Sequence, residues 1–153
     1  MVDTNLAETT SFMKKHGMLH FDAHGHNVMT DGHRLYFADF GLAISSLFDL
    51  SDEEKAFFAT HKDYDKIYVQ QDLIYNIFEA LKFEEQDAIN LLQKYVDGDQ
   101  TITYSTYITG ILKKYAHAAL LFEACNINLH KKSKLTPYPA QKIQEILDTN
   151  YKK

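Results

Sequence analysis

Residues 19–43 read LHFDAHGHNVMTDGHRLYFADFGLA, and this stretch decides the fold of the chain. Within this stretch or overlapping its start, three short runs (MLHF, NVMT and RLYFADF) are rich in apolar and aromatic residues, which is typical of β-strands. Asp31-Gly32 lies between the last two runs, and this dipeptide favours a tight hairpin turn. We therefore expect all of the strand structure between Met18 and Phe40.

The sequence outside this stretch predicts helices. Residues 5–16 favour a first helix that Gly17 ends. Ser51 and Glu54 form a capping-box pattern, which predicts a helix running to about His61. Apolar residues at helical spacing predict four more helices: one from about Asp65, one around residues 89–96, a longest one ending at Cys125, and one from Pro139. The predicted fold is α+β and mainly α, with a short β-hairpin region near the N-terminus and about five to six helices.

Composition limits the class of protein. The chain has 153 residues, among them ten Phe and ten Tyr, which is enough to form a buried core. We therefore expect one domain over residues 1–153, with the functional loops at 18–43 and a helical remainder at 51–152. A net charge of −5 argues against general nucleic-acid binding, and no apolar run is long enough to span a membrane. The single cysteine, Cys125, fits a reducing cytoplasm, and its apolar neighbours predict a buried thiol.

Histidines and acidic residues crowd into residues 20–39 in a way that no core requires. One interpretation is a zinc site formed by His20, His24 and His26, because zinc takes three or four nitrogen or sulfur ligands. Gly25 favours a loop rather than a strand face at this place, and the usual zinc-binding orders H-E-x-x-H and H-x-H-x-D are absent. We therefore favour a second interpretation, with no zinc.

The second interpretation rests on a pattern of three motifs in order. His20-Phe21-Asp22 is followed by Asn27 and, after the predicted hairpin, by Asp39-Phe40-Gly41. The order H-x-D-x-x-x-x-N and then D-F-G resembles the catalytic and metal loops of the protein-kinase-like superfamily. The resemblance covers roughly residues 5–125 and concerns only the C-terminal lobe of such enzymes, so the predicted fold is a kinase-like C-lobe without an N-lobe.

The resemblance implies a role for each polar residue of the pattern. Asp22 would be the catalytic residue that meets the acceptor hydroxyl, while Asn27 and Asp39 would hold Mg²⁺ against the phosphates of ATP. The implied activity is Mg²⁺-dependent transfer of the γ-phosphoryl group of ATP to a hydroxyl. The alternative is that the two carboxylates only cap turns.

Four further residues would support the site by the same resemblance. His20 would pack beneath the catalytic loop, and Phe40 and Gly41 would complete the metal loop. Asp72 precedes the apolar run Leu73-Ile74-Tyr75 and resembles the buried aspartate of the central helix that holds the catalytic-loop backbone in this superfamily.

His24, two residues after Asp22, resembles the D-x-H order of the aminoglycoside and choline kinase branch. The run RLYFADFGLA also resembles the atypical kinases of the RIO and tRNA-modification type. The expected acceptor is a small molecule, with a protein hydroxyl as the second possibility.

Half of a kinase active site has no counterpart in the sequence. The six glycines form no G-x-G-x-x-G, and no strand Lys precedes His20. We expect an N-lobe, a second polypeptide or a homodimer to cover the exposed surface, and this chain alone to bind Mg²⁺ and ATP weakly. The alternative is a kinase remnant that acts as a non-catalytic interaction module, so the sequence leaves open whether the chain is an enzyme.

Overall fold

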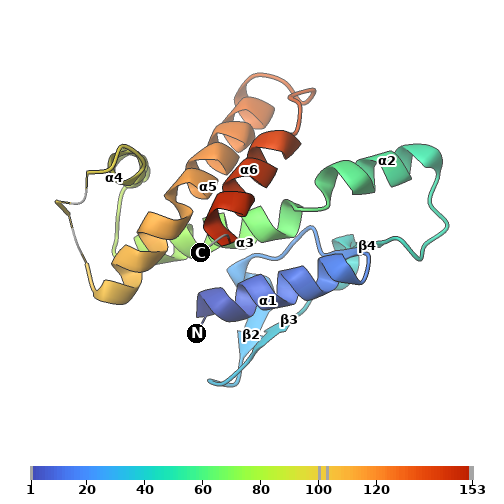
Figure 1. Ribbon diagram of the computed structural model, residues 1–153, viewed down its shortest axis with the longest axis horizontal. Helices are drawn as coiled ribbons and strands as arrows, with labels where there is room; N and C mark the ends of the chain where they lie inside the picture. Colours follow the sequence, from blue (N-terminus) through green and yellow to red (C-terminus); the bar gives the residue numbers. More distant parts are fainter. Residues whose placement is uncertain (1, 100, 103, 152–153) are drawn as a thin grey trace. The chain divides into compact units, whose positions relative to one another are not determined.

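The computed structural model describes residues 2–99, 101–102 and 104–151, and Lys152 of the predicted helical remainder lies outside them. The chain divides into two compact units, Met1–Val69 and Gln70–Lys153. Over the described residues helices dominate, and the strands form two short antiparallel pairs (Figure 1). The predicted class, α+β and mainly helical, is confirmed.

The first unit begins with helix α1 (Val2–Lys15). Leu6, Thr10 and Met13 are its buried residues, and their spacing of three and four places them on one face. This face packs next to the strands, since α1 contacts β1 and β3 (Figure 1). Gly17 then adopts φ +67°, a left-handed conformation that glycine tolerates best, and the helix ends as predicted.

Two strand pairs follow. β2 (Val28–Thr30) and β3 (Leu35–Phe37) form the predicted hairpin around Asp31-Gly32. β1 (Met18–Leu19) pairs with β4 (Ile44–Ser45), which lies beyond the limit predicted for strands. Beside this pair the Ser46 N–H donates to the Gly17 carbonyl at 2.7 Å. The prediction missed β4 because a distant partner strand, not local composition, specifies these two residues.

Two helices close the first unit. In α2 (Asp52–His61) the Ser51 side chain accepts from the Glu54 N–H while Glu54 accepts from the Ser51 N–H, so the predicted capping box is present. α3 (Tyr64–Ala80) follows, and its first turns belong to this unit. An ion pair between Lys14 of α1 and the buried Asp63 joins α1 to the start of α3.

The second unit is a helical core built from the rest of α3, α4 (Glu85–Val96), α5 (Thr106–Lys131) and α6 (Ala140–Tyr151). Its buried cluster joins α3, α4 and α5 and includes Ile74, Leu92, Leu112, Tyr115 and Ala119. Each large apolar side chain buried in this way contributes about 1.5–3 kcal/mol to folding. α5 runs six residues past Cys125, the end predicted for it.

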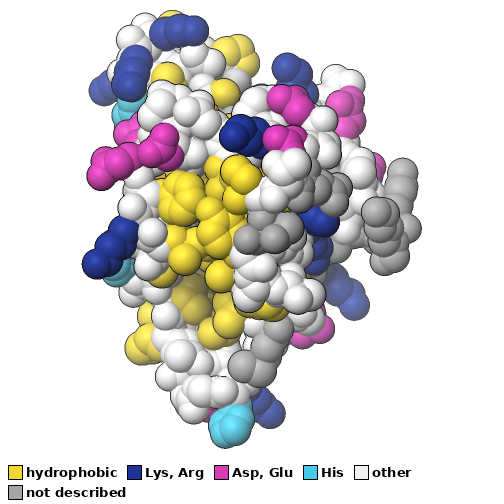
Figure 2. Space-filling view, turned by 90° about the vertical axis from the view of Figure 1, so that its left-hand side faces the viewer, with side chains coloured by type: hydrophobic (Ala, Val, Ile, Leu, Met, Phe, Trp, Pro, Cys, Tyr) yellow, Lys and Arg dark blue, Asp and Glu magenta, His cyan; other side chains and the backbone are white. Residues whose placement is uncertain are grey.

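Apolar surface remains exposed on the molecule. On the face shown in Figure 2, hydrophobic side chains gather into one area. Exposed large apolar residues include Leu42, Leu47 and Phe48 in the first unit and Leu135 in the second. Within the described residues, no helix combines the length and apolar character that crossing a membrane requires.

Candidate functional site

The segment His20–Asp22 is held in place by one buried carboxylate on α3. Asp65 accepts the backbone N–H of His20 through Oδ2 at 2.6 Å and that of Phe21 through Oδ1 at 2.9 Å. Burial raises the pKa of Asp65, and the two backbone hydrogen bonds oppose that effect. A buried carboxylate with two backbone donors is a rigid anchor for the loop, because either donor would be costly to leave unpaired.

This anchor corrects a prediction made from sequence. Asp72 was expected to hold the loop, but Asp65 accepts the two N–H groups instead, and Asp72 is half-buried with its Oδ2 accepting from Asn76 at 2.9 Å. The two aspartates lie seven residues apart, which is two helical turns, and each precedes a fully buried isoleucine by two positions. The sequences DKIY and DLIY therefore present the same local pattern, and the first of them was overlooked.

His20 lies beneath the loop as predicted, with none of its surface exposed. Its Nδ1 accepts from the Asp22 N–H at 3.3 Å, so the ring proton resides on Nε2 and is donated to the Ala38 carbonyl at 2.9 Å. Both ring nitrogens are thus used to join the loop to the strand end before Asp39. The Phe40 ring packs on His20 with centroids 4.6 Å apart, which ties the two motifs together.

Asp22 is partly exposed and takes part in a small polar network. Asn27 Nδ2 donates both to the Asp22 carbonyl and to Asp22 Oδ2, each at 2.9 Å. His24 Nε2 lies 3.4 Å from Asp22 Oδ1 and 3.3 Å from Asn27 Nδ2. One carboxylate oxygen is therefore held by the amide of Asn27 while the other faces His24.

Asn27 and Asp39 are brought together by the hairpin. β2 and β3 pair Val28 with Phe37, and the next bond outward runs from the Ala38 N–H to the Asn27 carbonyl at 2.8 Å. Asp39 follows directly and is exposed. The hairpin therefore places the two predicted metal ligands one position apart across neighbouring strands, which are spaced by about 4.8 Å.

The backbone is strained at two positions of this loop cluster. Among the described residues, positive φ outside glycine occurs at Phe21, Asp39 and Lys82. Phe21 (φ +62°) directly precedes Asp22, and Asp39 (φ +56°) accepts the Gly41 N–H at 3.3 Å. Strain of this kind costs about 1–3 kcal/mol per residue and concentrates at functional sites. The Asp65 hydrogen bonds to residues 20 and 21, together with the packing of the Phe21 ring on Phe57 and Tyr64, hold Phe21 in this conformation.

The histidines do not converge as the zinc interpretation requires. Nε2 of His20 contacts Ala38, Nε2 of His24 faces Asp22, and His26 is exposed. Over the described parts of the chain, no group of three or more His, Cys, Asp or Glu side chains is arranged to hold a metal ion. The pair Asn27 and Asp39 is smaller than such a group, and it contains only oxygen donors suited to a hard cation.

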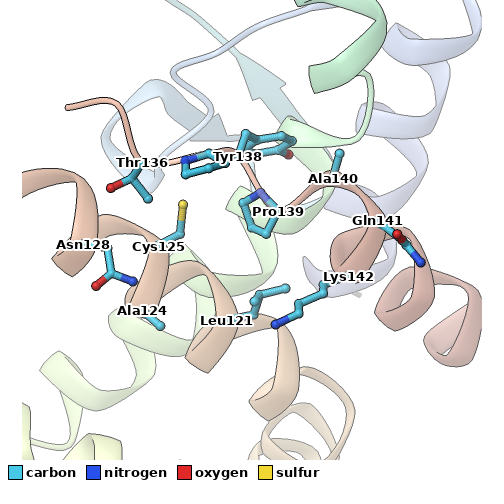
Figure 3. A pocket seen from close by; sticks show the side chains of 11 residues that line it. Leu121, Ala124, Cys125, Asn128, Thr136, Tyr138, Pro139, Ala140, Gln141 and Lys142 are labelled. Carbon is cyan, nitrogen blue, oxygen red and sulfur yellow. The ribbon is translucent and has the colours of Figure 1, made fainter. Parts of the chain in front are cut away.

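A pocket that no sequence motif predicted lies within the second unit. A pocket of about 590 Å³ lies between the end of α5 and the segment that enters α6 (Figure 3). Its lining includes Cys125, Asn128, Tyr138 and Lys142. Cys125 is half-buried, not buried as predicted, and desolvation raises the pKa of its thiol, which keeps it neutral and weakly nucleophilic. None of the residues predicted for catalysis lines this pocket.

Comparison of the chain with protein-family models, curated proteins and solved structures gave no match. The functional assignment therefore rests on the geometry of the loop cluster in the first unit.

Proposed function

We propose that the first unit carries the catalytic and metal loops of a protein-kinase-like phosphotransferase, which transfers the γ-phosphoryl group of ATP to a hydroxyl. The observation that carries the proposal is the double hydrogen bond from the His20 and Phe21 backbone to the buried Asp65. A turn that merely connects two strands has no need of a buried carboxylate at this position. The arrangement fixes the backbone directly before Asp22, which is what a positioned catalytic carboxylate requires.

Asp22 would meet the acceptor hydroxyl. Its carboxylate is partly exposed, and one oxygen is oriented by Asn27 Nδ2. A carboxylate so placed can align a hydroxyl and take its proton as the phosphoryl group is transferred. Turn capping alone does not account for Asp22, since the contacts of its carboxylate are with two side chains, Asn27 and His24.

The donor set fits Mg²⁺. Asn27 Nδ2 faces two acceptor oxygens, which fixes the orientation of the amide, and among the described residues none donates to its Oδ1. Asp39 uses Oδ1 for the Gly41 N–H, and no described residue donates to Oδ2. Mg²⁺ usually takes one or two protein oxygens and completes its shell with phosphate and water. When bound, it would neutralise charge on the phosphates of ATP.

The rest of the phosphate site would come from an N-lobe or a second polypeptide. The 153 residues contain no glycine-rich phosphate loop, so Asn27 and Asp39 alone would contact the metal and its nucleotide weakly. The D-x-H order at Asp22 and His24 favours a small-molecule acceptor over a protein acceptor.

Saturation-transfer NMR with ATP tests the proposal, because it detects weak binding. We expect a Kd near millimolar, about −4 kcal/mol, in the presence of Mg²⁺. Asp39→Asn should remove the Mg²⁺-dependent part of the signal while it keeps an acceptor for the Gly41 N–H. Asp31→Asn, at the far end of the hairpin, is the matched control and should bind like the wild type. ATP binding that is independent of Mg²⁺ and of Asp39 would contradict the proposal.

A second candidate function is a non-catalytic interaction module of the same fold. It is favoured by exposed apolar residues in the predicted metal loop and just after it, namely Phe40, Leu42, Leu47 and Phe48. Exposed apolar clusters of this kind mark protein contacts, including contacts between two copies of a chain. Sedimentation velocity would show a concentration-dependent dimer that Leu47→Ser weakens, together with no Mg²⁺-dependent ATP signal.

A further inference from the structure

We propose that His24 is the positioning residue of this site, and that it holds the Asp22 carboxylate and the Asn27 amide in the orientation they need. The inference rests on the proposed function, because it assigns a role toward the same metal and acceptor site. In the sequence, His24 belongs only to the D-x-H order and to the disfavoured zinc cluster. The contacts of both ring nitrogens of His24 assign it a role in orienting Asp22 and Asn27.

The tautomer of His24 follows from its neighbours. Nδ1 accepts the His26 N–H at 3.2 Å, so the ring proton of the neutral imidazole resides on Nε2. That nitrogen lies 3.4 Å from Asp22 Oδ1, so His24 contacts the carboxylate directly. The same nitrogen lies 3.3 Å from Asn27 Nδ2, so His24 contacts both side chains. His24 thus limits the rotation of both Asp22 and Asn27.

The three side chains restrain one another. Asp22 Oδ2 accepts from Asn27 Nδ2, and Asp22 Oδ1 faces His24 Nε2. With both carboxylate oxygens engaged, Asp22 cannot turn away without losing a contact at each end. Because Asn27 Nδ2 is directed at Asp22, the amide is oriented with Oδ1 on the other side, where no described residue donates to it.

His24 also has a local structural task, which must be separated from the positioning role. It is the N-cap of η1 (Gly25–Asn27), the short 3₁₀ turn that carries Asn27. Substitution of His24 by Asn or by Gln separates the N-cap role from the positioning role. Asn can accept the His26 N–H as an N-cap but is too short to reach Asp22, while Gln can place an amide N–H where Nε2 lies but is a poor N-cap.

The first test uses the metal-free chain. In ¹⁵N NMR spectra the side-chain amide of Asn27 reports its own hydrogen bonds. We expect His24→Ala and His24→Asn to shift this signal and increase its exchange with water, and His24→Gln to restore it. If His24→Asn restores the signal and His24→Gln does not, His24 is only a cap and the positioning role is overturned.

The second test uses Mn²⁺ alone, followed by the relaxation of water protons. Residues that orient metal ligands typically change metal affinity by about 10–100-fold when removed. We expect His24→Ala and His24→Asn to weaken Mn²⁺ binding about tenfold, and His24→Gln to recover most of the loss. His33→Ala, in the exposed turn of the hairpin, is the matched control and should bind like the wild type.

The outcomes distinguish the two proposals. Mn²⁺ binding that Asp39→Asn abolishes and His24→Ala leaves unchanged would overturn the role of His24 and keep the proposed function. A wild-type chain that binds no Mn²⁺ would overturn the proposed function, and the Asn27 amide signal would still decide whether His24 orients the loop.

Discussion

At the scale of single residues, Asp65 shows how a buried charge can be retained in a small unit. Its carboxylate is 2% exposed, and desolvation disfavours the ionised form. The His20 and Phe21 N–H groups compensate for this desolvation, because both donate to the Asp65 oxygens. Neither residue belongs to a regular strand or helix, so these N–H groups have no backbone partner in a strand or helix. Removing the carboxylate would therefore leave two unpaired donors near a fully buried histidine.

The stability of Asp65 variants tests whether this carboxylate anchors the loop. Each buried N–H left without a partner costs about 1–3 kcal/mol, so Asp65→Ala should lower the free energy of unfolding by about 2–6 kcal/mol. Asp65→Asn, which keeps one acceptor, should cost about half as much. Asp72→Asn, two turns along the same helix, is the control and should cost less than about 1 kcal/mol. Urea unfolding that ranks Asp72 above Asp65 would refute the anchor.

The turn of the hairpin has its own pH dependence. The backbone N–H groups of Arg34 and His33, and the hydroxyl of Tyr36, hold the pKa of Asp31 below its ordinary value. A lowered pKa means that the contribution is present above the unfolded value of about 3.9 and is lost as the pH falls through the lower folded pKa. Amide exchange in the hairpin should therefore rise below about pH 4. Asp31→Asn should remove this dependence, and an unchanged profile would contradict the assignment.

At the scale of elements, the junction of α1, β1 and β4 depends on Gly17. Gly17 has φ +67°, and a Cβ there would lie 2.0 Å from Ser46 Oγ, whereas Gly98 has φ +84° and open space around it. Gly98→Ala should therefore cost only the conformational strain, about 1–2 kcal/mol. Gly17→Ala should cost more in thermal unfolding, because strain and contact add, and Ser46→Ala should relieve part of the difference. Equal losses at the two glycines would contradict the close approach.

The elements also show which parts of the fold the sequence could predict. The hairpin and the α2 capping box were predictable because each depends on a few neighbouring residues. β4 was not, because its two residues form a strand only through pairing with β1. The end of α5 was misplaced because residues 125–129 are half-buried together and show no 3.6-residue apolar pattern that would mark a continuing helix.

At the scale of the molecule, the sequence could predict those residues of the candidate site that lie close together along the chain. Asp22, Asn27 and Asp39 are marked by spacing within one loop and hairpin; Asn27 binds Asp22 directly, and Asp39 follows the residue whose N–H donates to the Asn27 carbonyl. Asp65 was missed because a tertiary contact over 45 residues selects it from two equivalent local patterns. The contact of His24 with Asp22 was missed because the three-residue turn that directs the ring has no sequence signature.

The most direct measurement of the central claim is a map of Mn²⁺ broadening in the ¹⁵N-labelled chain. Mn²⁺ broadens the amide signals nearest to it, so the position of weakly bound metal can be read residue by residue. We expect the signals of Asn27, Val28, Asp39 and Phe40 to broaden first, and Asp39→Asn to abolish this effect. Broadening centred instead on the acidic first turn of α2, Asp52–Glu54, with no change around Asn27 and Asp39, would contradict it.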